Sequence, residues 1–211
     1  MDVRINIGCG QSPTPGWRNY DNSLSNRIAR LGPIARVVIP FLNPGQRSFV
    51  EFCQHNAIAY ADARRIPHAD NTVVVLYSSH MIEHLDRAAA RQFLGECWRV
   101  LQPGGILRLA APDLARYVRE YTNGRRTADA FMQSCTIEFE PTSFWQRLRH
   151  LFRPGRDHHW MYDGPSLTRL VTDVGFRDAK ALAPGETTIR EPGQLNLRER
   201  EDESCYVEAR K

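Results

Sequence analysis

Two glycines and a carboxylate lie close together near the start of the chain, in the stretch INIGCGQSPTPGWRNYDNS (residues 5–23). Gly8 and Gly10 follow a short apolar run that predicts a strand, and Asp21 is expected at the end of the next strand. Backbone without a Cβ can approach a ligand closely, and one carboxylate can accept hydrogen bonds from two hydroxyls. The stretch therefore favours a ligand that contains a ribose.

Each of these features also has a purely structural explanation. A strand-to-helix turn often needs glycine for its own geometry, and Asp21 can form an Asx turn with Asn22 and Ser23. Pro13 stands where a dinucleotide-binding turn has its third glycine, and proline offers no N–H to a pyrophosphate. The Gly-Lys-Ser/Thr sequence of a phosphate-binding P-loop does not follow, so the chemistry indicated is a nucleoside without a phosphate.

The elements that must position these residues alternate between strand-like and helix-like runs. Helices are expected at 86–101 and 166–176, and strands at 3–7, 57–61, 73–77, 106–110, 180–184 and 204–211. This alternation predicts an α/β fold with a mostly parallel central sheet and helices on both faces. Ligands of such sheets bind beyond the carboxyl ends of the strands, which is where Gly8, Gly10 and Asp21 are expected.

Composition indicates one soluble domain over residues 1–211, with 42% apolar and 25% charged residues. Residues 112–160 are too long for a plain connection, so we expect an inserted helical cap there. No run is long enough for a membrane span, and the first residues lack a signal-peptide pattern, so a cytoplasmic location is expected. The five cysteines are scattered without a CxxC pair, which favours reduced, buried thiols.

Five stretches, taken in order, resemble the class I S-adenosylmethionine-dependent methyltransferases. They are INIGCG…GWRNYD, DARRIP, SSHMIEHL, VLQPGG and HHWMYDGPSLTRLVTDVGF. The combination is similar to small bacterial methyltransferase-like proteins associated with polysaccharide or glycan biosynthesis. The resemblance implies a Rossmann-like methyltransferase fold, S-adenosyl-L-methionine as cofactor, and methyl transfer to an oxygen of a sugar, sugar nucleotide or lipid-linked saccharide.

The same resemblance implies a role for each residue along the carboxyl edge of the sheet. Gly8, Cys9 and Gly10 would pass beside the methionine part of the cofactor; Asp21 and Asn22 would hold the ribose; Asp62 would accept from the adenine amine, with Ala63 and Arg64 beside the ring; and Ser78, Ser79 and His80 would line the floor near the sulfonium. Two departures stand out. Val74 replaces a frequent aspartate, and only ten residues separate Gly10 from Asp21, where a full helix is usual.

An alcohol acceptor gains from a general base, which is most often histidine. Our first choice is His159 in RDHHWMYD, at the end of the predicted cap, followed by His80 or His84 in SSHMIEHL. Tyr162 is a candidate for orienting the substrate. A surface pair explains His158 and His159 equally simply.

The histidines of SSHMIEHL have two further interpretations. Glu83 and His84 can act structurally by holding the turn after the strand. His80 and His84 are four residues apart and would share a helical face, but no third ligand stands at the zinc-protease positions, so no metal is expected.

Residues 143–156 combine arginines with an apolar stripe. Such a segment can lie on an anionic membrane surface, close over a phosphate-bearing substrate, or pack its apolar side on the core. Peripheral contact of the segment 143–156 with the inner face of the membrane is therefore one candidate interaction. The basic cluster is short and the net charge is only +4, so nucleic acid is not expected as a partner. Two alternatives remain. The acceptor is another small molecule or a protein, or the chain binds a cofactor or a partner without catalysis.

Overall fold

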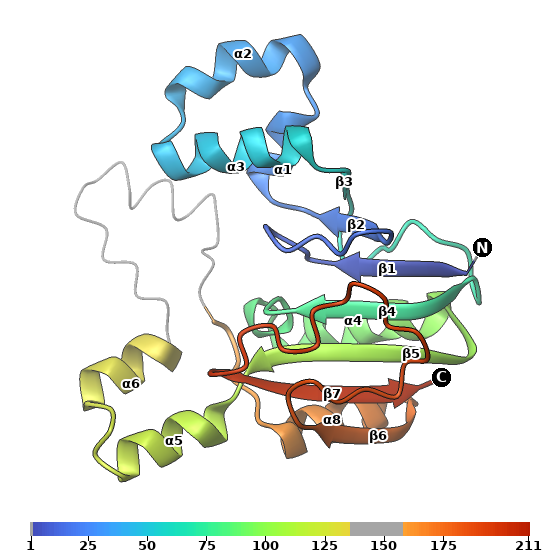
Figure 1. Ribbon diagram of the computed structural model, residues 1–211, viewed down its shortest axis with the longest axis vertical. Coiled ribbons are helices and arrows are strands. Elements are labelled where there is room, and N and C mark those ends of the chain that lie inside the picture. Colours follow the sequence, from blue (N-terminus) through green and yellow to red (C-terminus); the bar gives the residue numbers. More distant parts are fainter. Residues whose placement is uncertain (1, 136–157) are drawn as a thin grey trace.

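The computed structural model describes residues 2–135 and 158–211, and Figure 1 shows their arrangement. The strands are β1 Val3–Ile7, β2 Arg18–Asp21, β3 Ile58–Tyr60, β4 Val73–Ser79, β5 Leu101–Pro112, β6 Arg177–Leu182 and β7 Ser204–Arg210. The α-helices are α1 Leu24–Ala29, α2 Ala35–Val38, α3 Pro44–His55, α4 Arg87–Val100, α5 Leu114–Thr122, α6 Ala128–Cys135 and α8 Gly164–Val174. Three 3-10 helices join them: η1 Gly32–Ile34, η2 Ile39–Phe41 and η3 Ile82–His84.

The strands of the described residues form one sheet in the order β3-β2-β1-β4-β5-β7-β6 (Figure 1). Strands β1 to β5 pair in parallel, whereas β7 runs antiparallel to both β5 and β6. The mostly parallel sheet predicted from the alternating pattern is confirmed. All five parallel strands end at the same edge, which is the edge where a ligand of such a sheet is expected.

Helix α4 begins where the sequence predicts. Asp86 caps it by accepting a hydrogen bond from the backbone N–H of Ala89 (2.8 Å). The 3- and 4-residue spacing of apolar residues in 86–101 predicts one buried face that includes Trp98. Ala90, Phe93, Leu94 and Cys97 are buried as this spacing predicts, but for Trp98 the prediction is wrong, because it is 42% exposed. It lies instead under the ammonium of Lys211, 4.0 Å from the ring centroid.

The end of α4 also differs from expectation, because β5 begins at Leu101 directly after the helix. We expected the Pro-Gly-Gly sequence at 103–105 to separate helix from strand. In the structure Leu101 pairs with Val73, but Ile106 pairs with Val75, so the register shifts between these two pairs. The intervening residues form a bulge in the strand. This bulge needs a glycine at position 104, because Gly104 has a φ of +78°.

The sheet is covered differently on its two faces. Helices α4 and α8 pack on one face, where β-strand residues such as Ile5, Leu107 and Val207 form the main core. Residues 183–203, which connect β6 to β7, cover the other face over β4 and β5 with apolar side chains that include Ile189 and Leu195. A segment without regular secondary structure therefore occupies the place of a covering helix.

A buried ion pair anchors this covering segment. Arg108 on β5 and Glu208 on β7 are 0% and 1% exposed, and Nη1 of Arg108 lies 2.6 Å from Oε1 of Glu208. The guanidinium also donates to the carbonyl oxygens of Glu186 (2.9 Å) and Leu197 (3.0 Å). The carboxylate accepts from Thr188 at both its backbone N–H and its hydroxyl (2.7 Å each). The side chains of Arg108 and Glu208 thus form hydrogen bonds with backbone groups of the covering segment that have no partner in a helix or strand.

Residues 24–55, between β2 and β3, form a helical extension that the sequence did not predict. Helices α1, α2 and α3 stand beyond the β3 edge of the sheet (Figure 1). A small core that contains Ile28, Ala35 and Val50 holds them together. Proline at three places, Pro33, Pro40 and Pro44, breaks the segment into pieces too short to show a helical period.

The described part of the predicted cap is helical, since α5 and α6 follow β5 directly. Its basic amphipathic stretch at 143–156 lies outside the described residues. Among the helices of the described residues, none has the length and apolar character needed to cross a bilayer. All five cysteines are unpaired thiols, and four are buried, as predicted.

Candidate active site

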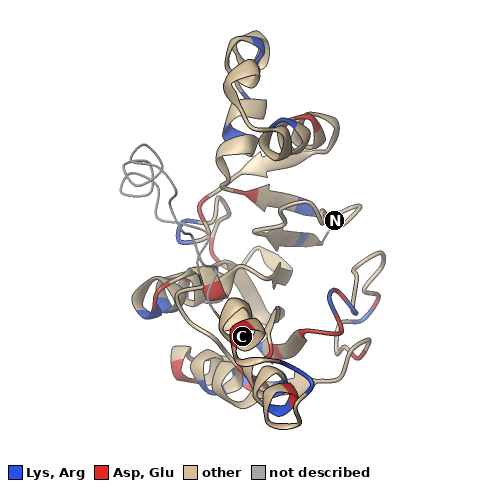
Figure 2. Cartoon of the chain, turned by 90° about the vertical axis from the view of Figure 1, so that its left-hand side faces the viewer, with Lys and Arg blue, Asp and Glu red and all other residues tan. Residues whose placement is uncertain are grey.

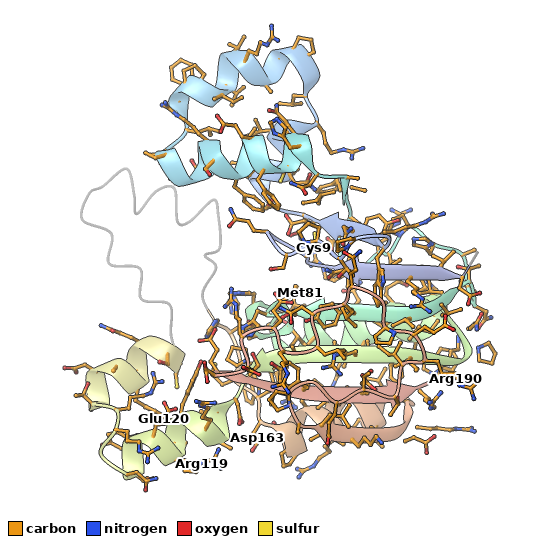
Figure 3. All side chains as sticks on the ribbon, in the orientation of Figure 1. Cys9, Met81, Arg119, Glu120, Asp163 and Arg190 are labelled. Atoms are coloured by element: carbon orange, nitrogen blue, oxygen red, sulfur yellow. The ribbon has the colours of Figure 1, made fainter. Side chains whose placement is uncertain are left out.

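The carboxyl ends of four neighbouring strands bring the predicted cofactor residues together. Gly8 follows β1, Asp21 ends β2, Asp62 follows β3 and Ser79 ends β4. The parallel register pairs Asn6 with Tyr77, so the chain leaves β1 and β4 at the same edge. Figure 3 labels Cys9 and Met81 at this end of the two strands.

Gly8 is required at its position for two independent reasons. Its φ is +72°, in the left-handed region. A Cβ built on Gly8 would lie 2.6 Å from Cγ and 2.9 Å from Cβ of Met81. Gly10 also has a positive φ, of +50°, but no heavy atom lies within 4 Å of the corresponding Cβ position. The first glycine thus permits close packing against the turn after β4, and the second permits only the backbone conformation.

Asp21 holds the glycine turn from the end of β2. Its Oδ2 accepts from the backbone N–H of Gly10 (3.3 Å) and its Oδ1 from that of Ser23 (2.8 Å). The second contact is the Asx turn considered as an alternative, so the structural role exists. Each oxygen accepts one bond here, whereas a carboxylate offers about four acceptor positions. Acceptor capacity therefore remains at a side chain that is 8% exposed.

Side-chain amides replace the missing first helix between β1 and β2. Nδ2 of Asn6 donates to the carbonyl oxygen of Ser12 (3.0 Å) and to the hydroxyl of Thr14 (3.1 Å). Asn19 accepts from the N–H of Thr14 (2.7 Å) and donates to its carbonyl oxygen (3.0 Å). These bonds pair buried backbone groups that a helix would pair internally, so the short connection keeps the glycine turn in a defined place.

Asp62 and Arg64 form a local pair after β3. The guanidinium of Arg64 donates to both carboxylate oxygens, from Nε at 3.0 Å and from Nη2 at 2.7 Å. These bonds are the main cause of an Asp62 pKa below its ordinary value. Ala63 between them is buried, whereas Asn22, the second predicted ribose residue, is exposed. Asp62 is thus an ionised acceptor at the strand end, already engaged by one partner.

Two further side chains at this edge, Ser78 and Cys9, bear on what the site can bind. The hydroxyl of Ser78 is buried and has no hydrogen-bond partner among the described residues. The Cys9 thiol is buried, and burial, reinforced by the Asp21 charge, raises its pKa, so it is neutral and not a nucleophile. A left-handed glycine turn, a carboxylate with spare acceptor positions and an unpartnered hydroxyl fit the methionine and ribose parts of S-adenosylmethionine.

A second group of polar side chains begins one residue beyond Ser79. His80 has φ of +47° and is held by its backbone N–H, which donates to the carbonyl oxygen of Ala110 (2.9 Å). Its Nε2 lies 2.8 Å from the hydroxyl of Ser204, and its Nδ1 lies 3.5 Å from Oε1 of Glu83. Glu83 is 1% exposed, and neither carboxylate oxygen accepts a hydrogen bond from the described residues. His80 is therefore a fixed side chain beside a buried acid.

The chain returning from the cap adds a histidine, but His158 rather than His159 faces this group. The ring of His158 lies 5.1 Å from that of His84, between centroids. Burial lowers the pKa of His158. The side chain of His159 is exposed, and only its backbone N–H joins the group, by donating to the carbonyl oxygen of Glu83 (2.8 Å). Tyr162, predicted to orient substrate, is 1% exposed within the main core.

Sequence reasoning missed two residues that the covering segment brings to this edge. Glu199 accepts from the hydroxyl of Tyr77 (2.8 Å) at its Oε2, and Ser204 contacts His80. Neither belongs to a recognisable motif. Glu83 and His158 were visible in the quoted motifs, but their burial and mutual approach depend on contacts distant in sequence.

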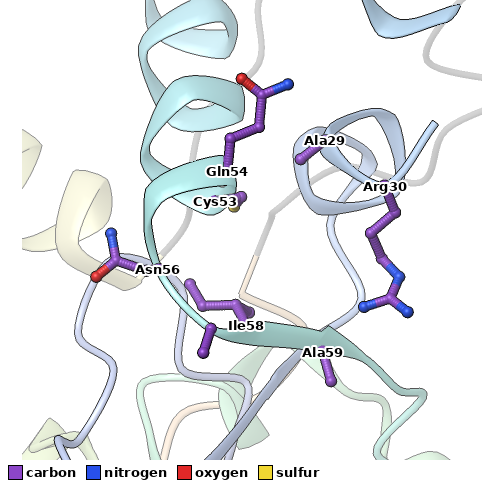
Figure 4. Close-up of a pocket in the computed structure, with 8 residues that line it drawn as sticks. Ala29, Arg30, Cys53, Gln54, Asn56, Ile58 and Ala59 are labelled. Carbon is purple, nitrogen blue, oxygen red and sulfur yellow. The ribbon is translucent and has the colours of Figure 1, made fainter. Parts of the chain in front are cut away.

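A surface pocket lies elsewhere, among α1, α3 and the start of β3 (Figure 4). Its volume is about 460 Å³, and its lining includes Arg30, Cys53 and Ile58. Ile58 begins β3, whereas the predicted cofactor residues follow the ends of the strands. None of those residues lines this pocket, but Cys9 packs in one small core with Cys53 and Ile58 of its lining.

Comparisons with known proteins concern the domain and the fold of the chain. Residues 22–109, from the end of β2 into β5, match the family model of a methyltransferase domain. No curated protein matches the chain. Three solved structures share its fold at low sequence identity. A SAM-dependent methyltransferase from Archaeoglobus fulgidus is 16% identical with a TM-score of 0.51, over 100% of this chain and 86% of that one.

The other two structures give the same picture. The PH0226 protein from Pyrococcus horikoshii OT3 is 12% identical with a TM-score of 0.53, over 99% of this chain and 81% of that one. An S-adenosylmethionine-dependent methyltransferase from Mesorhizobium loti is 16% identical with a TM-score of 0.50, over 99% and 90% of the two chains. These likenesses confirm the predicted Rossmann-like methyltransferase fold.

Proposed function

We propose that the chain, which is an S-adenosylmethionine-dependent methyltransferase, transfers the methyl group to a hydroxyl oxygen of a saccharide acceptor. The methyltransferase domain in residues 22–109 confirms the predicted enzyme class and cofactor. The acceptor is a sugar, a sugar nucleotide or a lipid-linked saccharide. This choice of acceptor class is supported by the resemblance of the five motifs described above.

The observation that carries the oxygen acceptor is the polar group of His80, Glu83, His84 and His158. A hydroxyl must give up its proton as it attacks, and histidine is the side chain most often used for that transfer. A neutral amine attacks through its lone pair and has less need of a base beforehand. Met81, inside the same turn, packs against Gly8, so the turn after β4 lies next to the glycine turn.

Each predicted cofactor residue keeps a defined task. When bound, S-adenosylmethionine supplies a methyl group on a positively charged sulfur. The glycine turn from Gly8 to Gly10 receives the methionine part, Asp21 accepts from the ribose hydroxyls, and Asp62 with Ala63 faces the adenine. The protein's remaining work is to hold the acceptor oxygen in line with the methyl group and to keep water out.

The histidines have different tasks in this proposal. His158 takes the proton of the acceptor hydroxyl, with His84 beside it. His80 is held by Ser204 and Glu83 and positions the turn. His159, our first choice from the sequence, is exposed and contributes its backbone N–H to the link with Glu83.

A labelled-methyl assay with a panel of acceptors tests the function. The panel contains sugar nucleotides, lipid-linked saccharides, simple phenols, amines and a peptide, and mass spectrometry locates the transferred methyl group. We expect an O-methylated saccharide, with His158→Gln losing most of the activity and the neighbouring His159→Gln retaining it. Methylation of a nitrogen, or full activity in both variants, contradicts the proposal.

A further inference from the structure

Two side chains near the turn after β4, Glu83 and His158, have buried polar atoms without a hydrogen-bond partner among the described residues, and the ring of His84 lies next to that of His158. One potential ligand atom from each of Glu83, His84 and His158 lies within 4.8 Å of the other two. Glu83 is 1% exposed, yet its carboxylate accepts no hydrogen bond from the described residues. Nδ1 of His158 is also buried without a partner among these residues. A buried carboxylate that accepts no hydrogen bond is costly, and a cation between the three side chains would reduce that cost, whereas Nδ1 of His80 stays 3.5 Å from Oε1 of Glu83.

We propose that Glu83, His84 and His158 bind one divalent transition-metal ion, with zinc as the best match. Two imidazoles and one carboxylate are the protein ligands of many catalytic zinc sites, which leave a fourth position open. Imidazole selects ions of the zinc, cobalt and iron group, whereas magnesium and calcium prefer sites made of oxygen ligands. The histidine content of this group therefore sets the class of ion.

The backbone prepares the site before any ion arrives. Glu83 and His84 belong to η3, and His158 lies on the chain that leads into α8. The carbonyl oxygen of Glu83 accepts from the N–H groups of His159 (2.8 Å) and Trp160 (3.2 Å). These two bonds fix the two segments against each other, so ligands distant in sequence are held together by main-chain contacts.

The role of the ion in catalysis rests on the proposed function. A metal-bound hydroxyl loses its proton more easily, so in the ion-bound chain the ion, and not the imidazole of its ligand His158, would activate the acceptor hydroxyl. Metal binding itself does not depend on methyl transfer. A chain that binds the ion but methylates no hydroxyl would retain this inference and lose the proposed function.

Cobalt is the probe for the experiment, because it occupies zinc sites and absorbs visible light. Tag-free full-length protein is stripped with a chelator and titrated with Co²⁺ and, by calorimetry, with Zn²⁺. We expect one ion per chain and visible absorption typical of low coordination number. His158→Gln and Glu83→Gln should each weaken binding about tenfold or more. The exposed His159→Gln and His55→Gln are matched controls and should bind as the unaltered chain does.

The outcomes are distinguishable. Absent cobalt absorption, or equal affinity in the His158→Gln and His159→Gln chains, overturns the metal site. Circular dichroism checks that each variant is folded. If Glu83→Gln fails to fold, His158→Gln decides the question, because its side chain is only half-buried.

A second, independent observation concerns the outer tip of the helical extension. Three large apolar side chains project into solvent there: Ile34 is 62% exposed, Val37 69% and Phe41 86%. All three lie on or beside α2, at the point farthest from the sheet (Figure 1). Scattered apolar residues are ordinary on a surface, but several on one short segment mark an interaction site.

The charges around this tip indicate its partner. Residues 22–50 contain four exposed arginines and no acidic residue, and Figure 2 shows basic residues distributed over the extension. Arg36 lies in α2, and Arg47 donates to the carbonyl oxygens of Pro40 and Leu42, so these two are at the tip. Arg27, over the ring of Tyr60, and Arg30, in the pocket at the start of β3, lie nearer the sheet. Apolar side chains flanked by arginines match a bilayer with anionic headgroups, in which the former enter the acyl boundary and the latter meet the phosphates.

We infer that the tip of the extension binds an anionic lipid surface. Vesicle co-sedimentation tests it with full-length protein, on phosphatidylcholine vesicles with and without phosphatidylglycerol. We expect binding only to the anionic vesicles, at least a tenfold loss in Phe41→Ser and in Arg36→Gln, and release by high salt. Val118→Ser, which changes an exposed apolar residue on α5, is the control and should bind normally.

Two results would refute the lipid surface. One is equal partition onto neutral and anionic vesicles. The other is a concentration-dependent dimer in analytical ultracentrifugation that Phe41→Ser abolishes, which would make the tip an interface between two copies of the chain.

Discussion

Gly8→Ala is the substitution for which the structure gives the clearest magnitude. An L-residue in the left-handed region costs about 1–2 kcal/mol, and Gly8 has φ of +72°. The new Cβ would lie 2.6 Å from Cγ of Met81, and overpacking of this kind costs about 1–3 kcal/mol more. We therefore expect the free energy of unfolding to fall by about 2–5 kcal/mol.

Gly10→Ala is the matched control. Its φ is also positive, but the added Cβ meets no heavy atom within 4 Å. The backbone cost of about 1–2 kcal/mol should therefore be the whole effect. Urea denaturation followed by circular dichroism gives both values, and calorimetry with S-adenosylhomocysteine reports whether the turn still binds. We expect both variants to bind more weakly, and Gly8→Ala to be the weaker.

A double-mutant cycle isolates the contact with Met81. Met81→Ala removes Cγ and leaves only the 2.9 Å approach to Cβ, so part of the Gly8→Ala loss should be recovered in the double variant. We expect a coupling energy of about 1 kcal/mol or more. Equal destabilisation by Gly8→Ala and Gly10→Ala, together with zero coupling, would refute the close packing of the glycine turn against the turn after β4.

Three further predictions concern buried charges. Asp21→Asn keeps an oxygen for the N–H of Ser23 but removes the charge, and calorimetry should show the affinity for S-adenosylhomocysteine reduced about tenfold or more; unchanged affinity would place the ribose elsewhere. Arg108→Met leaves Glu208 buried without its cation and should lower the free energy of unfolding by about 3–5 kcal/mol in urea melts; a loss within experimental error would show that the pair does not anchor the segment. Burial raises the pKa of Glu208, but its hydrogen bonds from Thr187, Thr188 and Arg108 outweigh burial and hold that pKa below 4.5. Its stabilisation is thus present above that value and is lost as the pH falls through the lower folded pKa. Glu208→Gln should therefore flatten the loss of stability as the pH falls below about 4.5, and an equally steep loss would assign the acid sensitivity to other groups.

The sequence predicted which residues lie at the carboxyl edge of the sheet because the causes of that placement are local. A β-branched or apolar run predicts a strand, glycines mark the turn after it, and parallel strands end at one edge. These steps placed Gly8, Asp21 and Asp62 correctly along that edge. They did not decide between ligand and structural roles for Asp21, and its bond to Ser23 shows that the structural role exists. A carboxylate with spare acceptor positions can serve both.

The histidine that joins the site was harder to predict, because His158 and His159 are neighbours in irregular backbone. Irregular backbone has no helical or strand periodicity that would predict which of the two imidazole rings faces the interior. The orientation depends on the bonds from His159 and Trp160 to the carbonyl oxygen of Glu83, and that residue is distant in sequence. The extension between β2 and β3 was missed for a different reason. Its helices are short, interrupted by proline, and supported by each other rather than by the sheet.

The segment 183–203 links the stability of the sheet to the geometry of the site. Arg108 and Glu208 hold its backbone on the sheet. Near its end, Glu199 accepts from the hydroxyl of Tyr77 and, at its carbonyl oxygen, from that of Tyr206 (2.8 Å each). Ser204, which begins β7, contacts Nε2 of His80. The segment thus positions the residues that hold His80, and a regular helix on that face would have left this histidine without them. The buried ion pair of Arg108 and Glu208 is therefore part of what fixes the turn that carries His80 in the candidate site.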